Sequence, residues 1–269
     1  RVTGPELWAT HGRFHPNVQA RCGALARMGA VVLSIDMFAF GDSIPVFGQE
    51  VHRQPFALTI QLWNAIRAVD FLESLPGIDP RRIAVTGESG GGTQAFFLTA
   101  LDDRVAVSVP AVMVSAHWFG CPCEGGLPVH RSADHFASNP VIAALAAPRP
   151  MLLISDGQDW TANTPQVEFP FVQAIYRRVG AEDRVANVHL PDEGHDYGPS
   201  KRAALYRFLA LRLGLDSAAV LTAAGEIDES RVVIEPHGLM HFFDAAHPVP
   251  ERAMRTAADV ERVLKELQR

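Results

Sequence analysis

The 269-residue chain has little of several features that would assign it to a specialised class. Its three cysteines are too few for a disulfide-rich scaffold. No apolar run is long enough to span a bilayer. Basic residues are in the minority, because 24 Lys and Arg stand against 30 Asp and Glu and give a formal net charge of −6. We therefore expect neither nucleic acid nor an anionic membrane among its partners.

The remaining composition is that of an ordinary globular protein with a sizeable core. Apolar residues make up 48% of the chain and charged residues 20%. The length fits one large α/β domain, or a domain with an appendage. No signal peptide is visible, but this says little about the compartment because the chain starts at Arg1 rather than at methionine. The sequence also leaves the oligomeric state open.

One stretch carries the main chemical signal. A short β-branched run, Ile83 to Val85, is typical of a strand, and residues 93–100 favour a helix. Between them, residues 87–91 read G-E-S-G-G, a G-x-S-x-G sequence in the strand–turn–helix setting of a nucleophile elbow. This setting predicts that Ser89 is a nucleophile and that the N–H of Gly90 helps to hold an oxyanion. The alternative is a glycine-rich turn that contains a serine.

A serine nucleophile needs a base, and the base needs an acid that orients it. His195 follows Gly194 in a polar loop between an expected strand, residues 185–190, and an expected helix, residues 201–213. The glycine permits the tight turn that an imidazole on a loop requires. His195 is therefore the predicted base.

Three carboxylates compete for the role of the acid. Asp159 is favoured because it lies deeper in the loop that follows the expected strand 151–155. Asp156, at the start of that loop, is the alternative and is otherwise a turn residue. Glu124, on a separate long loop, is a further rival. The chain order serine, acid, histidine is that of an α/β-hydrolase.

The rest of the chain up to residue 215 alternates helices and strands, which predicts a mostly parallel sheet with helices on both faces. Further helices are expected at residues 16–28, 57–75 and 166–179, and further strands at 30–35 and 105–114. There is almost no room before residue 16 for the first strands of such a fold. A backbone N–H near Gly12 or Arg13 is the candidate for the second oxyanion donor.

Residues 115–140 form a long insertion that we expect to act as a partial lid. Its predicted substrate-binding residues, together with one from a later loop, are His117, Trp118, Glu124 and Trp160. A group of His130, Asp134 and His135 could be metal ligands, but a hydrogen-bonded loop is favoured, and no metal or cofactor is expected. The loop cysteines, Cys121 and Cys123, are interpreted as free thiols, with a disulfide to Cys22 as the alternative.

The α/β alternation ends after residue 215. Residues 216–269 are predicted to form a small α+β appendage packed on a catalytic domain of residues 1–215, because so short a segment cannot bury a stable core alone. Strands are expected at 231–235 and 239–243, and a helix at 253–267.

Several motifs in order give a resemblance to a known family. They are GESGGGTQ (87–94), VMVSAH (112–117), APRP (147–150), DWTANTP (159–165), GAEDR (180–184) and GHDY (194–197). Over roughly residues 10–215 the chain resembles bacterial α/β-hydrolases of the acetylxylan-esterase-like group, which neighbours the dienelactone-hydrolase-like and prolyl-oligopeptidase-like hydrolases. The resemblance implies a triad of Ser89, Asp159 and His195.

The functional prediction is a serine carboxylesterase that hydrolyses small acyl esters, such as acetyl groups on a carbohydrate. A glucuronoyl-type or dienelactone-type ester hydrolase, or a peptidase, is the alternative among enzymes. A catalytically silent binding protein with the same fold is the alternative from another class. The expected partner is a small-molecule or carbohydrate ester.

Overall fold

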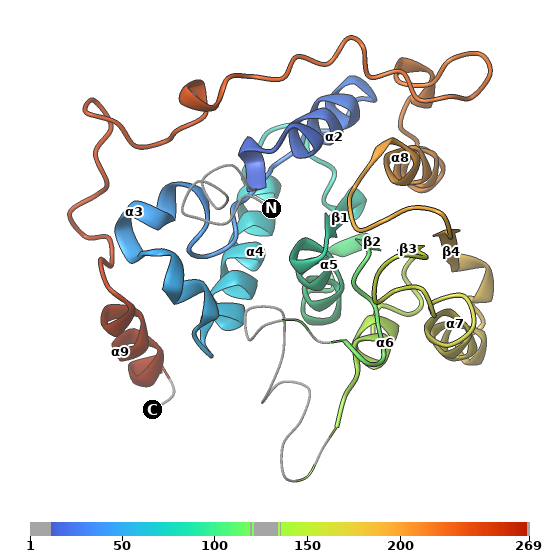
Figure 1. The fold of residues 1–269 in the computed structure, drawn as a ribbon, viewed down its shortest axis with the longest axis horizontal. Helices are drawn as coiled ribbons and strands as arrows, with labels where there is room; N and C mark the ends of the chain where they lie inside the picture. Colours follow the sequence, from blue (N-terminus) through green and yellow to red (C-terminus); the bar gives the residue numbers. More distant parts are fainter. Residues whose placement is uncertain (1–11, 119, 121–133, 135, 268–269) are drawn as a thin grey trace.

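The computed structural model describes residues 12–118, 120, 134 and 136–267. At its centre is a four-stranded parallel sheet with the strand order β1-β2-β3-β4 (Figure 1). The strands are β1 (Ile83–Glu88), β2 (Val105–Ala111), β3 (Met151–Asp156) and β4 (Val185–Leu190). The predicted parallel sheet of an α/β-hydrolase fold is confirmed.

Helices connect these strands and cover the sheet. Their bounds are α2 (Pro16–Arg27), α3 (Ile44–Phe47), α4 (Ala57–Ser74), α5 (Gly90–Leu101), α6 (Asn139–Ala144), α7 (Glu168–Arg178), α8 (Pro199–Leu213) and α9 (Ala257–Leu267). Short 3₁₀ turns lie at Gly12–Phe14, Gly41–Ser43, Gln49–Arg53, Pro80–Arg82, Glu182–Arg184, Ser217–Ala219 and His237–Leu239.

The two faces of the sheet each have their own apolar core, because successive side chains of a strand point to opposite faces. In β3, Met151 and Leu153 pack with residues of α4, α5, α6 and α7. The alternate residues, Leu152 and Ile154, pack with α2 and α8. All four β3 side chains are 2% exposed or less, so the strand is buried from both sides.

The expected strand at residues 30–35 is wrong: this segment has no regular secondary structure and joins no ladder among the described residues. Its alternate apolar side chains, Val31, Leu33 and Ile35, are 60%, 38% and 42% exposed. A cavity of about 950 Å³ is lined by this segment and by β1. An apolar run becomes a strand only when its backbone N–H and C=O groups have a neighbouring strand to pair with. Here residues 30–35 line the cavity and pair with no strand among the described residues.

The two strands expected at 231–235 and 239–243 are also wrong. This part of the chain has a 3₁₀ turn, Val233 and Phe242 are each 72% exposed, and neither segment joins a ladder within the described ranges. Between α8 and α9 the chain runs as a long irregular segment past α2 to the side of α3 (Figure 1). Side chains hold it there: Arg202 binds Glu229, and Asp42 accepts a hydrogen bond of 2.7 Å from the N–H of Phe242.

Helix α9 begins four residues later than expected, at Ala257. The Thr256 hydroxyl accepts from the N–H of Asp259, whose carboxylate in turn accepts from the Thr256 N–H at 3.1 Å, so the pair caps the first turn. Val260 of this helix is 1% exposed and packs in a small cluster with Phe38 and Val51. The division of the chain at residue 215 stays a prediction.

Candidate active site

Ser89 lies at the sharp turn between β1 and α5. Its backbone has φ +61° and ψ −117°, a conformation that non-glycine residues rarely adopt and that is held here by its neighbours. The N–H of Ser89 donates to the carbonyl of Ala111 at 3.1 Å, and its own carbonyl accepts from Thr93 at 2.9 Å. The turn therefore ties the end of β1 to the end of β2 and to the first turn of α5.

The glycines around Ser89 are required by close backbone approach. A Cβ on Gly87 would lie 2.4 Å from the backbone of Gly91, and a Cβ on Gly92 would lie 2.7 Å from the carbonyl oxygen of Ala111. The helix starts at Gly90, three residues earlier than the expected Thr93. The Gly90 N–H is thus in the first turn of the helix, where backbone donors are left free for an anion.

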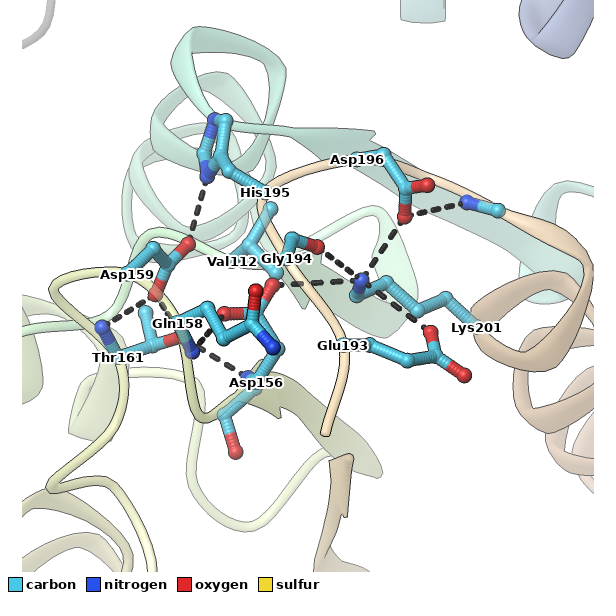
Figure 2. A network of polar contacts seen from close by, with 12 residues as sticks. Val112, Asp156, Gln158, Asp159, Thr161, Glu193, Gly194, His195, Asp196 and Lys201 are labelled. Atoms are coloured by element: carbon cyan, nitrogen blue, oxygen red, sulfur yellow. Dashed lines mark hydrogen bonds and ion pairs between the residues drawn. The ribbon is translucent and has the colours of Figure 1, made fainter. Parts of the chain in front are cut away.

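The structure pairs His195 with Asp159 (Figure 2). The Nδ1 of His195 lies 2.6 Å from Oδ2 of Asp159, and because a carboxylate only accepts, the imidazole N–H donates. The other oxygen of Asp159 accepts from the N–H of Thr161 at 2.5 Å and from its hydroxyl at 2.6 Å. Burial raises the pKa of Asp159, but these hydrogen bonds from His195 and Thr161 outweigh it and hold the pKa below its ordinary value.

Of the other two candidate acids, the structure describes Asp156, which faces Lys201 instead of His195. Asp156 is completely buried, and its Oδ2 lies 3.3 Å from Nζ of Lys201. Burial and the neighbouring charge of Asp159 raise the pKa of Asp156. Glu124 lies outside the described residues.

The sheet places the candidate residues at one edge. Ser89 follows β1, Asp159 follows β3 in the loop after Asp156, and His195 follows β4. All four strands are parallel and adjacent, so the three side chains emerge at the carboxyl ends of the strands, the edge where open α/β sheets bind their ligands.

Two indole rings stand beside the imidazole. Trp160 and Trp118 are stacked with ring centroids 4.9 Å apart, and the Trp160 ring is 4.3 Å from that of His195. The indole N–H of Trp160 donates to the carbonyl of Val112 at 3.2 Å, which fixes the ring against the end of β2. Trp118 is 44% exposed and leaves one aromatic surface open to a ligand. Trp160 therefore contacts the imidazole, Trp118 joins this pair by stacking on Trp160, and the His117 ring interacts with the Ser115 hydroxyl at 3.1 Å.

The two expected oxyanion donors border the same space as the candidate nucleophile. Gly12, Ser89 and Gly90 line the cavity of about 950 Å³. The N–H of Arg13, the alternative to Gly12, already donates to Oδ1 of Asp36 at 3.2 Å. Gly12 is therefore the better candidate of the two.

Sequence reasoning missed two residues of the site, Thr161, which binds the candidate acid, and Lys201, which binds the histidine loop. Thr161 follows Asp159 by two residues, a spacing at which a threonine commonly bonds back to an aspartate. Lys201 is a buried lysine. The signal that could have pointed to it is the presence of three carboxylates in the ten residues before it, Asp192, Glu193 and Asp196.

The described part of the chain bears on three further expectations, which concern metals, disulfides and membrane spans. No group of three or more His, Cys, Asp or Glu among those residues is arranged to hold a metal ion, and His130 and His135 lie outside them. Cys22 is a free thiol, which is against the disulfide alternative, whereas Cys121 and Cys123 are not described. In the same residues, no helix combines the length and the apolar character needed to cross a membrane.

The sheet, its helices and the chain order of these residues are those of the α/β-hydrolase fold. The family profile described as "Glucuronyl esterase, fungi" matches residues 46–122. A solved structure titled "Methylesterase BT1017" is 43% identical, covers 95% of this chain and 58% of its own, and superposes with a TM-score of 0.85.

Two curated relatives are more distant. A "Putative hydrolase YtaP" of Bacillus subtilis (strain 168) is 28% identical over 173 residues, which is 59% of this chain and 57% of the relative. A "4-O-methyl-glucuronoyl methylesterase" of Neurospora crassa is 25% identical over 210 residues, 64% of this chain and 52% of the relative. The chain thus spans somewhat more than half the length of these proteins. The matches show a relationship to hydrolases and esterases of this fold, but they do not support the narrower acetylxylan-esterase-like group.

Proposed function

We propose that this chain carries a serine carboxylesterase site that cleaves an ester of a sugar uronic acid, such as a methyl uronate. One observation carries the proposal. Ser89 lies on a strained turn at the carboxyl edge of the sheet, and the hydrogen-bonded pair of Asp159 and His195 lies at the same edge. A serine on such a turn has its hydroxyl held clear of the backbone, and a base fixed by a buried carboxylate is what its activation requires.

In the proposed reaction, Nε2 of His195 takes the proton of Ser89 as Oγ attacks the ester carbonyl. The oxyanion of the tetrahedral intermediate is held by the N–H of Gly90 and by the N–H of Gly12. His195 then gives the proton to the departing alcohol, which leaves an acyl-enzyme, and water activated by the same imidazole releases the acid. Asp159 keeps the proton of His195 on Nδ1, so that Nε2 is free to act as the base.

The substrate part of the proposal is supported by the aromatic surface and by the relatives. Trp118 and Trp160 present an apolar stacked surface beside His195, suited to the apolar face of a sugar ring. Both the solved relative and the Neurospora crassa relative are named as methylesterases, and the second name specifies a glucuronoyl group. In a uronate ester the sugar is the acyl part and would sit next to Ser89, whereas in the acetyl ester expected from the sequence the sugar is the leaving alcohol.

The test is a matched comparison of substrates on the purified chain. Methyl glucuronate and methyl galacturonate esters are compared with acetylated xylose, with Ser89→Ala as the control. The proposal expects turnover of a methyl uronate that the Ser89 variant loses, with a higher kcat/KM than for the acetate. A preference for the acetate would restore the acetyl-ester prediction, and no turnover of any ester by the wild type would favour the silent binding protein.

A further inference from the structure

We propose that Lys201 is a positioning residue for His195: its ammonium group bridges the loop that carries the base to the end of the strand that leads to the acid. This inference rests on the proposed esterase site and adds to it a residue that does not touch the substrate.

Lys201 holds the histidine loop on both sides of the histidine. It lies in the first turn of α8 and its side chain is completely buried. Its Nζ donates to the carbonyl of Gly194 at 2.7 Å and to Oδ1 of Asp196 at 2.8 Å (Figure 2). These two residues immediately precede and follow His195, so one ammonium group restrains the backbone on either side of the imidazole.

The same ammonium group reaches the acid loop. Nζ lies 3.3 Å from Oδ2 of Asp156, the last residue of β3, and 3.4 Å from Oε2 of Glu193. Asp159 comes three residues after Asp156. Lys201 therefore ties the histidine loop to the end of β3, from which the acid loop starts, beside the 2.6 Å bond between His195 and Asp159 and the 3.0 Å bond from the Gln158 side chain to the carbonyl of Asp192.

The charges around the group explain why a cation is needed there. Asp156, Glu193 and Asp196 face Nζ from β3 and from the histidine loop, and Asp159 lies just beyond Asp156. Burial lowers the pKa of Lys201, but its bonds to Asp196 and Asp156 outweigh it and raise the pKa above the ordinary value. The lysine is thus charged at neutral pH, and a neutral side chain could not hold these carboxylates together.

The test separates positioning from stability with two active-site variants. Lys201→Met removes the cation but leaves Asp156 buried and unpaired, which lowers the Tm. The double variant Lys201→Met/Asp156→Asn removes both charges and is expected to recover much of that Tm, because replacing a whole buried ion pair costs less than removing one partner. Arg149→Met is the matched control: Arg149 also donates to backbone carbonyls, those of Asp102 and Val105, but at the opposite end of the strands.

The expected result is a fall in kcat of about 10- to 100-fold in the double variant on a methyl uronate, with KM within about threefold, since small misplacements of a catalytic group lower kcat steeply. Arg149→Met is expected to lower the Tm but to leave kcat unchanged. A double variant that regains both the Tm and the wild-type kcat overturns the positioning role while the esterase proposal stands.

A second, exposed position covers the case in which the buried variants do not fold. The Asp196 side chain is 54% exposed, and Asp196→Ala removes one of the two anchors on the histidine loop. It is expected to lower kcat about 3- to 10-fold. Asp192→Ala, an exposed carboxylate of the same loop without a contact to Lys201, should have no effect. Equal kcat values for these two variants would overturn the proposal, whereas a wild type without turnover would instead overturn the esterase function.

Discussion

Replacing Asp159 by asparagine should place the proton of His195 on the wrong nitrogen. The backbone N–H of Thr161, which can only donate, points at Oδ1 of Asp159 at 2.5 Å, and the Thr161 hydroxyl donates to the same oxygen at 2.6 Å. The amide oxygen of an asparagine must therefore face Thr161, and its NH₂ group must face His195. An NH₂ donor needs an unprotonated Nδ1, so the proton moves to Nε2 and the imidazole can no longer act as the base.

The size of the effect follows from this change of tautomer. In a serine–histidine–aspartate triad it lowers kcat by about 10⁴-fold, which is about 5 kcal/mol of barrier. Steady-state kinetics on a methyl uronate at pH 7 measures it, with Tm as the check on folding. Asp156→Asn, three residues earlier at the end of β3, is the matched control, and we expect it to lose less than tenfold, because Asp156 faces Lys201 rather than His195. A loss of less than tenfold for Asp159→Asn, together with a large loss for Glu124→Gln, would assign the acid to Glu124 and refute the argument.

Three further predictions concern the aromatic surface, the elbow and the segment after α8. Trp118→Ala should raise KM for a methyl uronate by about 2- to 13-fold, the equivalent of about 0.5–1.5 kcal/mol, and should change kcat little. An unaltered KM would contradict a contact between Trp118 and the sugar. Gly87→Ala should lower the free energy of unfolding by about 1–3 kcal/mol in urea titrations, because the added Cβ would lie 2.4 Å from the Gly91 backbone. Glu229→Ala should lower it by about 3–5 kcal/mol, because Arg202, with a side chain 5% exposed, loses its carboxylate. Burial raises the pKa of Glu229, but hydrogen bonds from Arg202 and Tyr206 outweigh it and lower the pKa. The stabilisation that Glu229 gives to the folded state is therefore present above about pH 4.3 and is lost as the pH falls below that value. On acidification the wild type should lose more free energy of unfolding than Glu229→Ala. Equal losses would contradict the ion-pair argument.

The sequence predicted the central part of the fold because its signals there are local. Buried parallel strands are continuous apolar runs, and the run 151–155 falls within β3, whose last residue is Asp156. The strand–glycine–serine–helix pattern likewise places Ser89 at the elbow, since the close packing of strand and helix leaves no room for a Cβ at positions 87 and 92. Two local signals selected the pair that the structure joins. They were the glycine next to His195 in its loop and the position of Asp159 after an expected strand.

The expectations that were wrong depended on non-local pairing. The runs 30–35, 231–235 and 239–243 have the alternation or apolarity of strands, but a strand also needs a neighbour, and sequence patterning does not tell whether one is there. The network of Lys201 is another case. A lysine in a helix is ordinarily solvated, and only the fold brings the carboxylates of two separate loops around its ammonium group.

The most direct test of the central claim is labelling of the purified chain with a fluorophosphonate, followed by intact mass and peptide mapping. The reagent reacts with a serine hydroxyl that a working base has activated. The account predicts a single adduct that maps to Ser89, disappears in Ser89→Ala and forms far more slowly in Asp159→Asn. A folded wild-type protein that takes up no adduct, or an adduct at another serine, would contradict it.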